Sequence, residues 1–264
     1  MCLILFAYRA HPDYELVVAA NRDEFYARPT APLAFWDDAP DVLAGRDLQA
    51  GGTWLGITRA GRFAALTNYR DPARLLPEAP SRGRLVGACL RDAAPARATL
   101  DRLAAPAAAY NGFNLVLSDG EGLYYFSNLT GDYRALAPGW YGLSNHLLDT
   151  GWPKVRRGLT ALRQALDRRR DPDPDDLLSL LTDRTPAPDA ELPDTGVPLD
   201  WERWLSPLFI EAPGYGTRSS TVLLADTAGR ARMVEMTWDD GSRREFHLDW
   251  PLARHFYPEP RADS

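Results

Sequence analysis

A chain of 264 residues with 45% hydrophobic and 25% charged residues is long enough for one sizeable core and has the composition of a soluble globular protein. Its formal net charge of -6 argues against a nucleic-acid-binding surface, which needs a basic face. Two cysteines are too few for a secreted disulfide scaffold, and the apolar stretch near the start is too short to cross a bilayer. We therefore expect a cytoplasmic protein without an integral membrane segment.

The first part of the chain predicts two β-hairpins. They are expected over Cys2–Tyr8 with Glu15–Ala20 and over Thr53–Thr58 with Arg62–Thr67. Ala60-Gly61 supplies a turn signal for the second hairpin. The intervening segment, from Asn21 to about Gly52, is rich in Pro, Asp and Gly, and we expect it to be irregular.

The middle of the chain changes to helical spacing, and strands return at its end. Helices are expected from Ser81 through Leu90 and over Pro95–Leu103, Val155–Leu166 and Pro174–Leu181. Strands are expected over 113–117, 123–127, 141–144, 220–224, 231–236 and 244–249, with a proline-rich connector over 185–198. Grouped helices between antiparallel strands predict an α+β layered protein, which we interpret as a single domain over 1–264.

Cys2 is the first candidate for chemistry. A small residue after Met1 favours removal of Met1 by methionine aminopeptidase, which would leave an α-amine and a thiol on one residue. The amine has a pKa of roughly 7.7–8 and the thiol about 8.5, so the amine can accept the thiol proton and return it to a leaving group. The alternative is a small core residue at a strand start.

The block Asn21-Arg22-Asp23-Glu24 follows an apolar strand that a hairpin returns towards Cys2. Arg22 could lower the thiol pKa or hold a substrate carboxylate. Asp23 or Glu24 could orient the amine. A solvated turn is the alternative interpretation.

Other candidates stand at the edges of predicted strands. Each of three residues adjoins one of these strands: Asn68, Asn145 and Arg218. A side-chain amide beside a nucleophile, as an asparagine would supply, can stabilise an oxyanion. The alternative is that each of the three is an ordinary turn residue. The Gly51-Gly52-Thr53-Trp54 block predicts special backbone angles or a close approach rather than a phosphate loop.

The remaining reactive side chains predict no metal site. The four histidines show neither HExxH spacing nor a Cys/His cluster. Cys89 lies on a helical apolar face and is expected in the core.

Together these blocks resemble the NRDE family, also called the transport-and-Golgi-organisation family. The resemblance is carried by the opening Met-Cys-Leu-Ile, Ala20–Phe25, Ala44–Asp47, Gly51–Gly56, Leu66–Arg70, Gly142–His146, Trp152–Val155 and Thr217–Thr221. It implies the four-layer αββα sandwich of N-terminal-nucleophile (Ntn) hydrolases, nearest to the choloylglycine hydrolase and penicillin V acylase branch. That branch has an aspartate three residues after its arginine, where this chain has Phe25.

The resemblance also implies roles for individual positions. Cys2 matches the nucleophile, Arg22 the arginine after the second strand, and Asn145 the oxyanion asparagine. Arg218 matches a late active-site arginine, and Asn68 lies in the block that helps form the oxyanion hole.

Two functional hypotheses follow. The first is a cysteine hydrolase of a linear amide or related acyl bond in a small-molecule substrate, requiring no cofactor. The second is a haem or lipid-like ligand carrier on the same fold, with His146 or a thiolate as axial ligand and Trp54 as a wall. The oligomeric state and the ligand's identity are open at this point.

Overall fold

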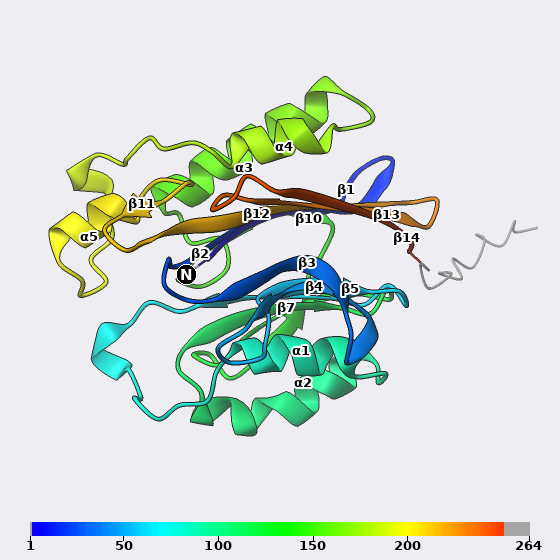
Figure 1. Ribbon diagram of the computed structural model, residues 1–264, viewed down its shortest axis with the longest axis horizontal. Helices are drawn as coiled ribbons and strands as arrows, with labels where there is room; N and C mark the ends of the chain where they lie inside the picture. The colour runs from blue at the N-terminus through cyan, green and yellow to red at the C-terminus, as the bar shows by residue number, and fades with distance from the viewer. Residues whose placement is uncertain (1, 251–264) are drawn as a thin grey trace, which may run out of the picture.

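The computed structural model describes residues 2–250. These residues form two antiparallel sheets stacked face to face, with helices on both outer faces (Figure 1). The four layers are those expected of an αββα sandwich, so the predicted α+β architecture is confirmed.

The first sheet combines the opening and closing strands of the chain. Its hydrogen-bonded order is β10 (Gly139–Leu143), β1 (Cys2–His11), β2 (Tyr14–Phe25), β12 (Tyr215–Asp226), β13 (Arg230–Thr237) and β14 (Arg243–Asp249), and the short β11 (Glu211–Ala212) pairs with β12. The long β2 and β12 pair along most of their length. Segments nearly two hundred residues apart in the chain therefore meet at the centre of this sheet.

The second sheet follows chain order. It runs β3 (Thr30–Trp36), β4 (Ala39–Asp47), β5 (Leu55–Thr58), β6 (Phe63–Asn68), β7 (Phe113–Ser118), β8 (Leu123–Ser127) and β9 (Tyr133–Ala135). The predicted second hairpin is β5–β6, with Gly61 at positive φ in its turn.

The prediction of an irregular segment from Asn21 to Gly52 is wrong. β2 continues to Phe25, and β3 and β4 follow it. Pro32 is tolerated in β3 because that strand lies at the edge of its sheet, where a missing backbone donor costs no ladder hydrogen bond. Turn-forming residues inside β3 and β4 therefore hid both strands.

Helices cover the two outer faces. α1 (Gly83–Arg91) and α2 (Ala96–Ala104) pack on the second sheet, and α3 (Pro153–Arg168) and α4 (Pro174–Leu180) pack on the first. The predicted connector over 185–198 contains only the short 3-10 helix η3 (Asp189–Glu191), and α5 (Leu199–Trp204) follows it. Two further 3-10 helices are η1 (Pro72–Arg74) and η2 (Pro106–Ala109).

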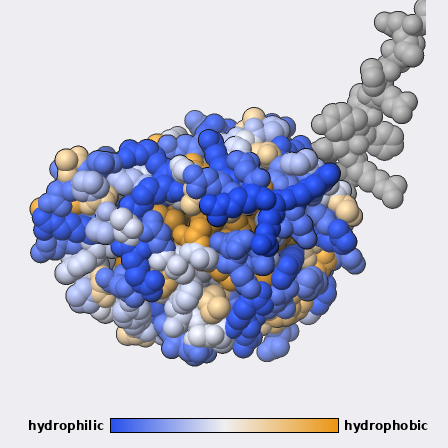
Figure 2. All heavy atoms as spheres, turned by 90° about the horizontal axis from the view of Figure 1, so that it is seen from above, coloured by the Kyte–Doolittle hydropathy of each residue, from blue (hydrophilic) through white to orange (hydrophobic). Residues whose placement is uncertain are grey.

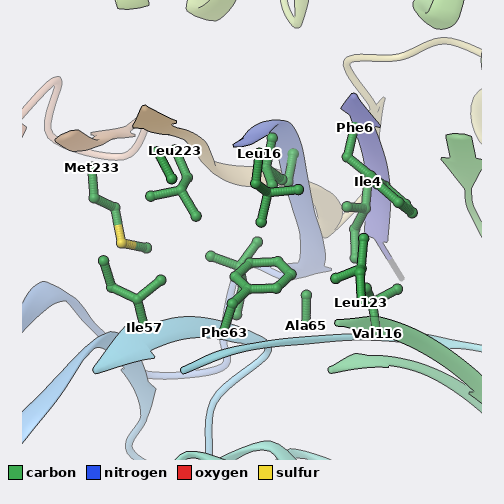
Figure 3. Close-up of a cluster of buried hydrophobic side chains, with 14 of the residues drawn as sticks. Ile4, Phe6, Leu16, Ile57, Phe63, Ala65, Val116, Leu123, Leu223 and Met233 are labelled. Carbon is green, nitrogen blue, oxygen red and sulfur yellow. The ribbon is translucent and has the colours of Figure 1, made fainter. Parts of the chain in front are cut away.

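The main core lies between the sheets, where Ile4, Phe6 and Leu16 face Ile57 and Phe63 (Figure 3). The alternate residues of β1, such as Leu3 and Leu5, point to the helices instead. Because β1 is buried on both faces, its sequence is a continuous apolar run.

The outer face that carries α3 and α4 is mostly hydrophilic, with hydrophobic atoms showing in a central hollow (Figure 2). Among residues 2–250, no helix has the length and apolar character needed to cross a membrane.

Candidate active site at the start of the first strand

A cavity of about 560 Å³ opens beside the first residue of β1. Its walls come mainly from three parts of the chain: the start of β1 with the end of β2, the segment between β4 and β5 that includes Thr53 and Trp54, and the long connection between β6 and α1. Cys2, Arg22, Asp23 and Asn68 all line it, so four of the six predicted site residues meet in one place. Asn145 and Arg218 are not among its lining residues.

Strand register brings Cys2 and Arg22 together, because they are direct cross-strand partners in the β1–β2 ladder. The Arg22 side chain is 5% exposed, and its guanidinium lies 4.2 Å from the centre of the Trp54 ring. It also donates to Thr30 Oγ1 at 3.0 Å. Stacking and hydrogen bonding together hold the arginine against one wall of the cavity.

The Cys2 thiol is less acidic than the sequence led us to expect. Burial raises its pKa, and the Asp23 carboxylate adds to the increase. Arg22 and the Asp23 backbone N–H, which donates to the sulfur, act in the opposite direction. Arg22 thus lowers the thiol pKa in the predicted direction, but burial outweighs the nearby positive charge and the net pKa is raised.

Asp23 and Glu24 occupy different environments on β2. Asp23 is fully buried and accepts a hydrogen bond from Thr217 Oγ1 at 2.7 Å. Burial raises the pKa of its carboxyl group, and the positive charge of Lys154 opposes the increase. Glu24 is partly exposed and lies 3.9 Å from Arg22 and 3.7 Å from Arg28. Because Asp23 interacts with Cys2 and Glu24 with arginines, Asp23 is the better placed of the two to orient an amine on Cys2.

Asn68 and Asn145 are neighbours in space although 77 positions separate them. Asn145 is completely buried, and its amide nitrogen donates to the Asn68 carbonyl oxygen at 3.1 Å. The adjacent Ser144 hydroxyl lies 3.4 Å from the Cys2 carbonyl oxygen. The asparagine pair therefore adjoins Cys2, with Asn68 in the cavity wall and Asn145 buried outside the lining.

Arg218 contacts the backbone of the turn between β2 and β3. It sits at an irregularity in the β2–β12 ladder, between Thr217 and Ser219. Its guanidinium donates to the carbonyl oxygens of Phe25 and Arg28, at 3.0 and 3.1 Å, and pairs with Asp239. Arg218 thus holds the turn that leads from β2 to β3. Phe25, at the position where the resembling branch has an aspartate, is largely exposed.

The sequence analysis missed several residues that shape the cavity. Arg28 forms two hydrogen bonds with Asp47, the shorter at 2.6 Å, and both side chains line the wall. Arg82, on the connection to α1, donates to the Gly112 carbonyl oxygen and also lines it. Salt-bridge partners distant in sequence could not be read from local patterns.

The glycines next to Trp54 have the properties that the sequence predicted. Gly51 has a positive φ of 73°. A Cβ on Gly52 would lie 2.3 Å from the Gly83 backbone, so the start of α1 approaches too closely for any other residue. This contact fixes one rim of the cavity.

His146, the candidate haem ligand, does not line the cavity. Its Nδ1 lies 2.8 Å from Thr150 Oγ1, and its ring packs against Tyr69 and Trp152. Among residues 2–250, no cluster of three or more His, Cys, Asp or Glu side chains has the arrangement of a metal site.

A second cavity, of about 600 Å³, lies between β4, β5 and the α1–α2 connection. Its lining residues include neither a cysteine nor a histidine. Arg62, the buried cation in its wall, is already bonded to Cys89 O, Ala94 O and Thr99 Oγ1. The Cys2 cavity is therefore the candidate reaction site.

Comparison with known proteins identifies the family of the chain. The family model described as Transport and Golgi organisation 2 matches residues 1–240 of the chain. The chain belongs to the Transport and Golgi organisation 2 family. It is 38% identical to the Transport and Golgi organization protein 2 homolog of Bos taurus, over 93% of this chain and 96% of the relative. The Homo sapiens homolog is 36% identical over 91% of this chain and 94% of its own.

This member of the Transport and Golgi organisation 2 family also matches a solved hydrolase structure. The C2A mutant of the conjugated bile acid hydrolase from Clostridium perfringens superposes with a TM-score of 0.52 at 7% identity, covering 93% of this chain and 92% of the other. At that identity the match establishes a shared Ntn-hydrolase fold. The roles of individual residues rest on the geometry described above.

Proposed function

We propose that the protein is an N-terminal-nucleophile cysteine hydrolase that cleaves a linear carbon–nitrogen amide or a related acyl bond. The observation that carries the proposal is the position of Cys2: the first residue of β1 lies in the wall of a 560 Å³ cavity, opposite a fixed arginine and beside a buried carboxyl group. Removal of Met1 would place an α-amine and the thiol at the same point.

The proposed reaction uses the Cys2 amine as base and acid. The amine takes the thiol proton, and the thiolate attacks the substrate carbonyl carbon, forming a C–S bond and moving the C=O electron pair onto oxygen. Collapse of this intermediate breaks the C–N bond, and the amine returns the proton to the leaving nitrogen. Water then cleaves the thioester, releasing the acid and restoring the thiol.

Nearby groups would assist particular steps. The Asn145 side-chain amide, which bonds to Asn68, and a backbone N–H near Asn68 would stabilise the oxyanion, an effect worth a few kcal/mol per donor in such sites, roughly 2.7–4. Asp23 would orient the protonated amine. Arg22, fixed by Trp54 and Thr30, would bind an acidic or carbonyl group of the substrate.

The test begins with the intact mass of the purified protein, which shows whether Met1 has been removed. The processed protein is then incubated with a panel of linear amides and thioesters, and acyl adducts are located by peptide mass. We expect an adduct on Cys2 in the unaltered chain and in Cys89→Ala, and none in Cys2→Ala. An absence of adducts and turnover across the panel in processed protein would contradict the proposal.

The haem-carrier alternative predicts a different outcome in the same material. A haem titration followed by absorbance would give a saturable one-to-one shift. No histidine lines the Cys2 cavity within residues 2–250, so haem in it would depend on the Cys2 thiolate. A shift that persists in Cys2→Ala would place haem elsewhere.

A further inference from the structure

The lining of the Cys2 cavity has an excess of positive charge in a chain that is acidic overall. Four arginines and three side chains with carboxyl groups line the cavity, whereas the formal net charge of the whole chain is -6. These residues are Arg22, Arg28, Arg82 and Arg84, and Asp23, Glu24 and Asp47. A cleft lined by an excess of one sign of charge concentrates ligands of the opposite sign. The lining therefore favours a substrate that carries a negative charge.

Two of the four arginines are offset by carboxylates within the wall itself. Arg28 pairs with Asp47 at 2.6 Å and lies 3.7 Å from Glu24. Arg22 lies 3.9 Å from the same Glu24 oxygen. The third carboxyl group, that of Asp23, accepts a hydrogen bond from β12. The charges of Arg22 and Arg28 are therefore shared with Glu24 and Asp47 before any ligand enters.

Arg82 differs from these two arginines because no carboxylate offsets its charge. Within residues 2–250 it forms no ion pair, and its hydrogen bond to the protein is the 2.9 Å bond from Nη1 to the Gly112 carbonyl oxygen. Its Nε–H and Nη2–H groups have no acceptor in that part of the chain. These two groups form one edge of the guanidinium fork, which matches the two oxygens of a carboxylate.

Backbone contacts fix the position of Arg82 in the wall. Arg82 directly precedes α1, whose first residue, Gly83, accepts a hydrogen bond from the Thr53 N–H at 3.0 Å. The residue after Thr53 is Trp54, whose ring centre lies 4.2 Å from the Arg22 guanidinium. The two arginines are therefore held on one connected part of the wall. A donor held in place before binding loses little conformational entropy when a ligand arrives.

Arg82 and Cys2 belong to the same site. Both side chains line the 560 Å³ cavity. Burial lowers the pKa of the Arg82 guanidinium, and negative charge on Glu24 and on the Cys2 sulfur opposes the decrease. A ligand group bound to Arg82 would therefore lie in the cavity that gives access to the Cys2 sulfur.

We propose that the Cys2 cavity selects substrates that carry a carboxylate, and that Arg82 is the specificity residue that binds this group. The carboxylate accepts hydrogen bonds from Nε–H and Nη2–H of Arg82, and the exposed Arg84 adds a weaker, salt-screened attraction. Arg22, whose charge is shared with Glu24, remains for the acyl group at the reacting carbon. The inference deepens the proposed function and rests on it in taking Cys2 as the reacting residue.

The first test compares two alkylating reagents of nearly equal size, the anionic iodoacetate and the neutral iodoacetamide. Their rates at Cys2 are measured at one pH in processed Cys89→Ala protein and expressed as a ratio. Because both reagents react with the same thiolate, a change in the thiol pKa cancels from the ratio. We expect a ratio above that of a small free thiol such as N-acetylcysteine, and a fall of about threefold or more in Arg82→Gln.

The matched control is Arg91→Gln, which removes an arginine from the wall of the second cavity and should leave the ratio unchanged. Arg82→Lys keeps the positive charge and should retain most of the ratio. If Arg82→Gln alters both rates in the same proportion, the arginine only holds the connection to α1 in place and the inference fails. A ratio equal to that of the free thiol would also refute it.

The second test uses turnover and separates the two proposals. Processed protein is given pairs of linear amides that differ only in ending in a carboxylate or in the corresponding alcohol. The carboxylate members should have the higher kcat/KM, and Arg82→Gln should reduce this preference through KM. Equal turnover of both members would overturn the carboxylate preference alone. Turnover of neither member, with charge-selective alkylation intact, would overturn the proposed function alone.

Discussion

Replacing Arg218 with methionine tests whether this arginine acts as a structural clamp. Arg218→Met keeps most of the side-chain packing but leaves the Phe25 and Arg28 carbonyl oxygens without their guanidinium donors. Phe25 O keeps the Arg28 N–H as a donor and Arg28 O keeps the Thr30 hydroxyl, so the cost is that of two lost hydrogen bonds at about 1–1.5 kcal/mol each, about 2–3 kcal/mol in total. At roughly 2–4 °C per kcal/mol for a chain of this size, the melting temperature should fall by about 4–12 °C.

The assay is thermal unfolding followed by circular dichroism, with Asp239→Asn as the matched control. Asp239 is the charged partner of Arg218, but its side chain is 44% exposed, so its loss should cost less than about 1 kcal/mol. If Arg218→Met melts within 2 °C of the unaltered protein (about half the smallest predicted fall), the clamp is not the reason for the arginine. Loss of Cys2 acylation at an unchanged melting temperature would instead support the active-site role that the family resemblance implies for Arg218.

Three further predictions concern stability and reactivity. Burial raises the pKa of Glu235 from 4.5 to about 6. The stabilising contribution of its carboxyl group is therefore present below pH 4.5 and is lost as pH rises through 6. Glu235→Gln should remove roughly 2 kcal/mol of pH dependence from the free energy of urea unfolding in this window. Gly142→Ala would place a Cβ 2.4 Å from Val155 Cγ1, which should destabilise the protein by about 1–3 kcal/mol, whereas Gly151→Ala, with no atom within 4 Å, should melt almost unchanged. Burial raises the pKa of Cys89 to about 11; peptide mapping after iodoacetamide treatment of the folded protein at neutral pH should therefore find the label on Cys2, and faster labelling of Cys89 would contradict the structure.

Local pattern was enough to predict the elements that frame the site. The continuous apolar run of β1 and its hairpin with β2 follow from side-chain type alone, because a strand buried on both faces needs apolar residues at every position. The same hairpin predicts that Cys2 and Arg22 lie close together, and they are cross-strand partners. The helical spacing of α1 likewise places Cys89 in the core.

Local pattern failed where a contact between distant segments decides the outcome. The polar residues Asn21 and Asp23 resemble a solvated turn, but β12 pairs with this part of β2. The hydroxyls of Ser220 and Thr217 on β12 donate hydrogen bonds to these two side chains, so both can be buried. Local pattern also could not show that Arg218, beside the irregular pairing of Thr217 and Ser219, bonds to the backbone of the β2–β3 turn.

Lys154 shows the division most clearly. The sequence alone determines that the chain has one lysine among its many arginines, and therefore one such side chain able to lose its proton under mild conditions. Only the packing of α3 against the first sheet decides that this lysine is buried and that the charges of Asp23 and Cys2 act on its pKa. The physical reason is that composition and periodicity report the chemistry and the buried face of each element, whereas the proximity of charges 131 positions apart depends on how the layers pack.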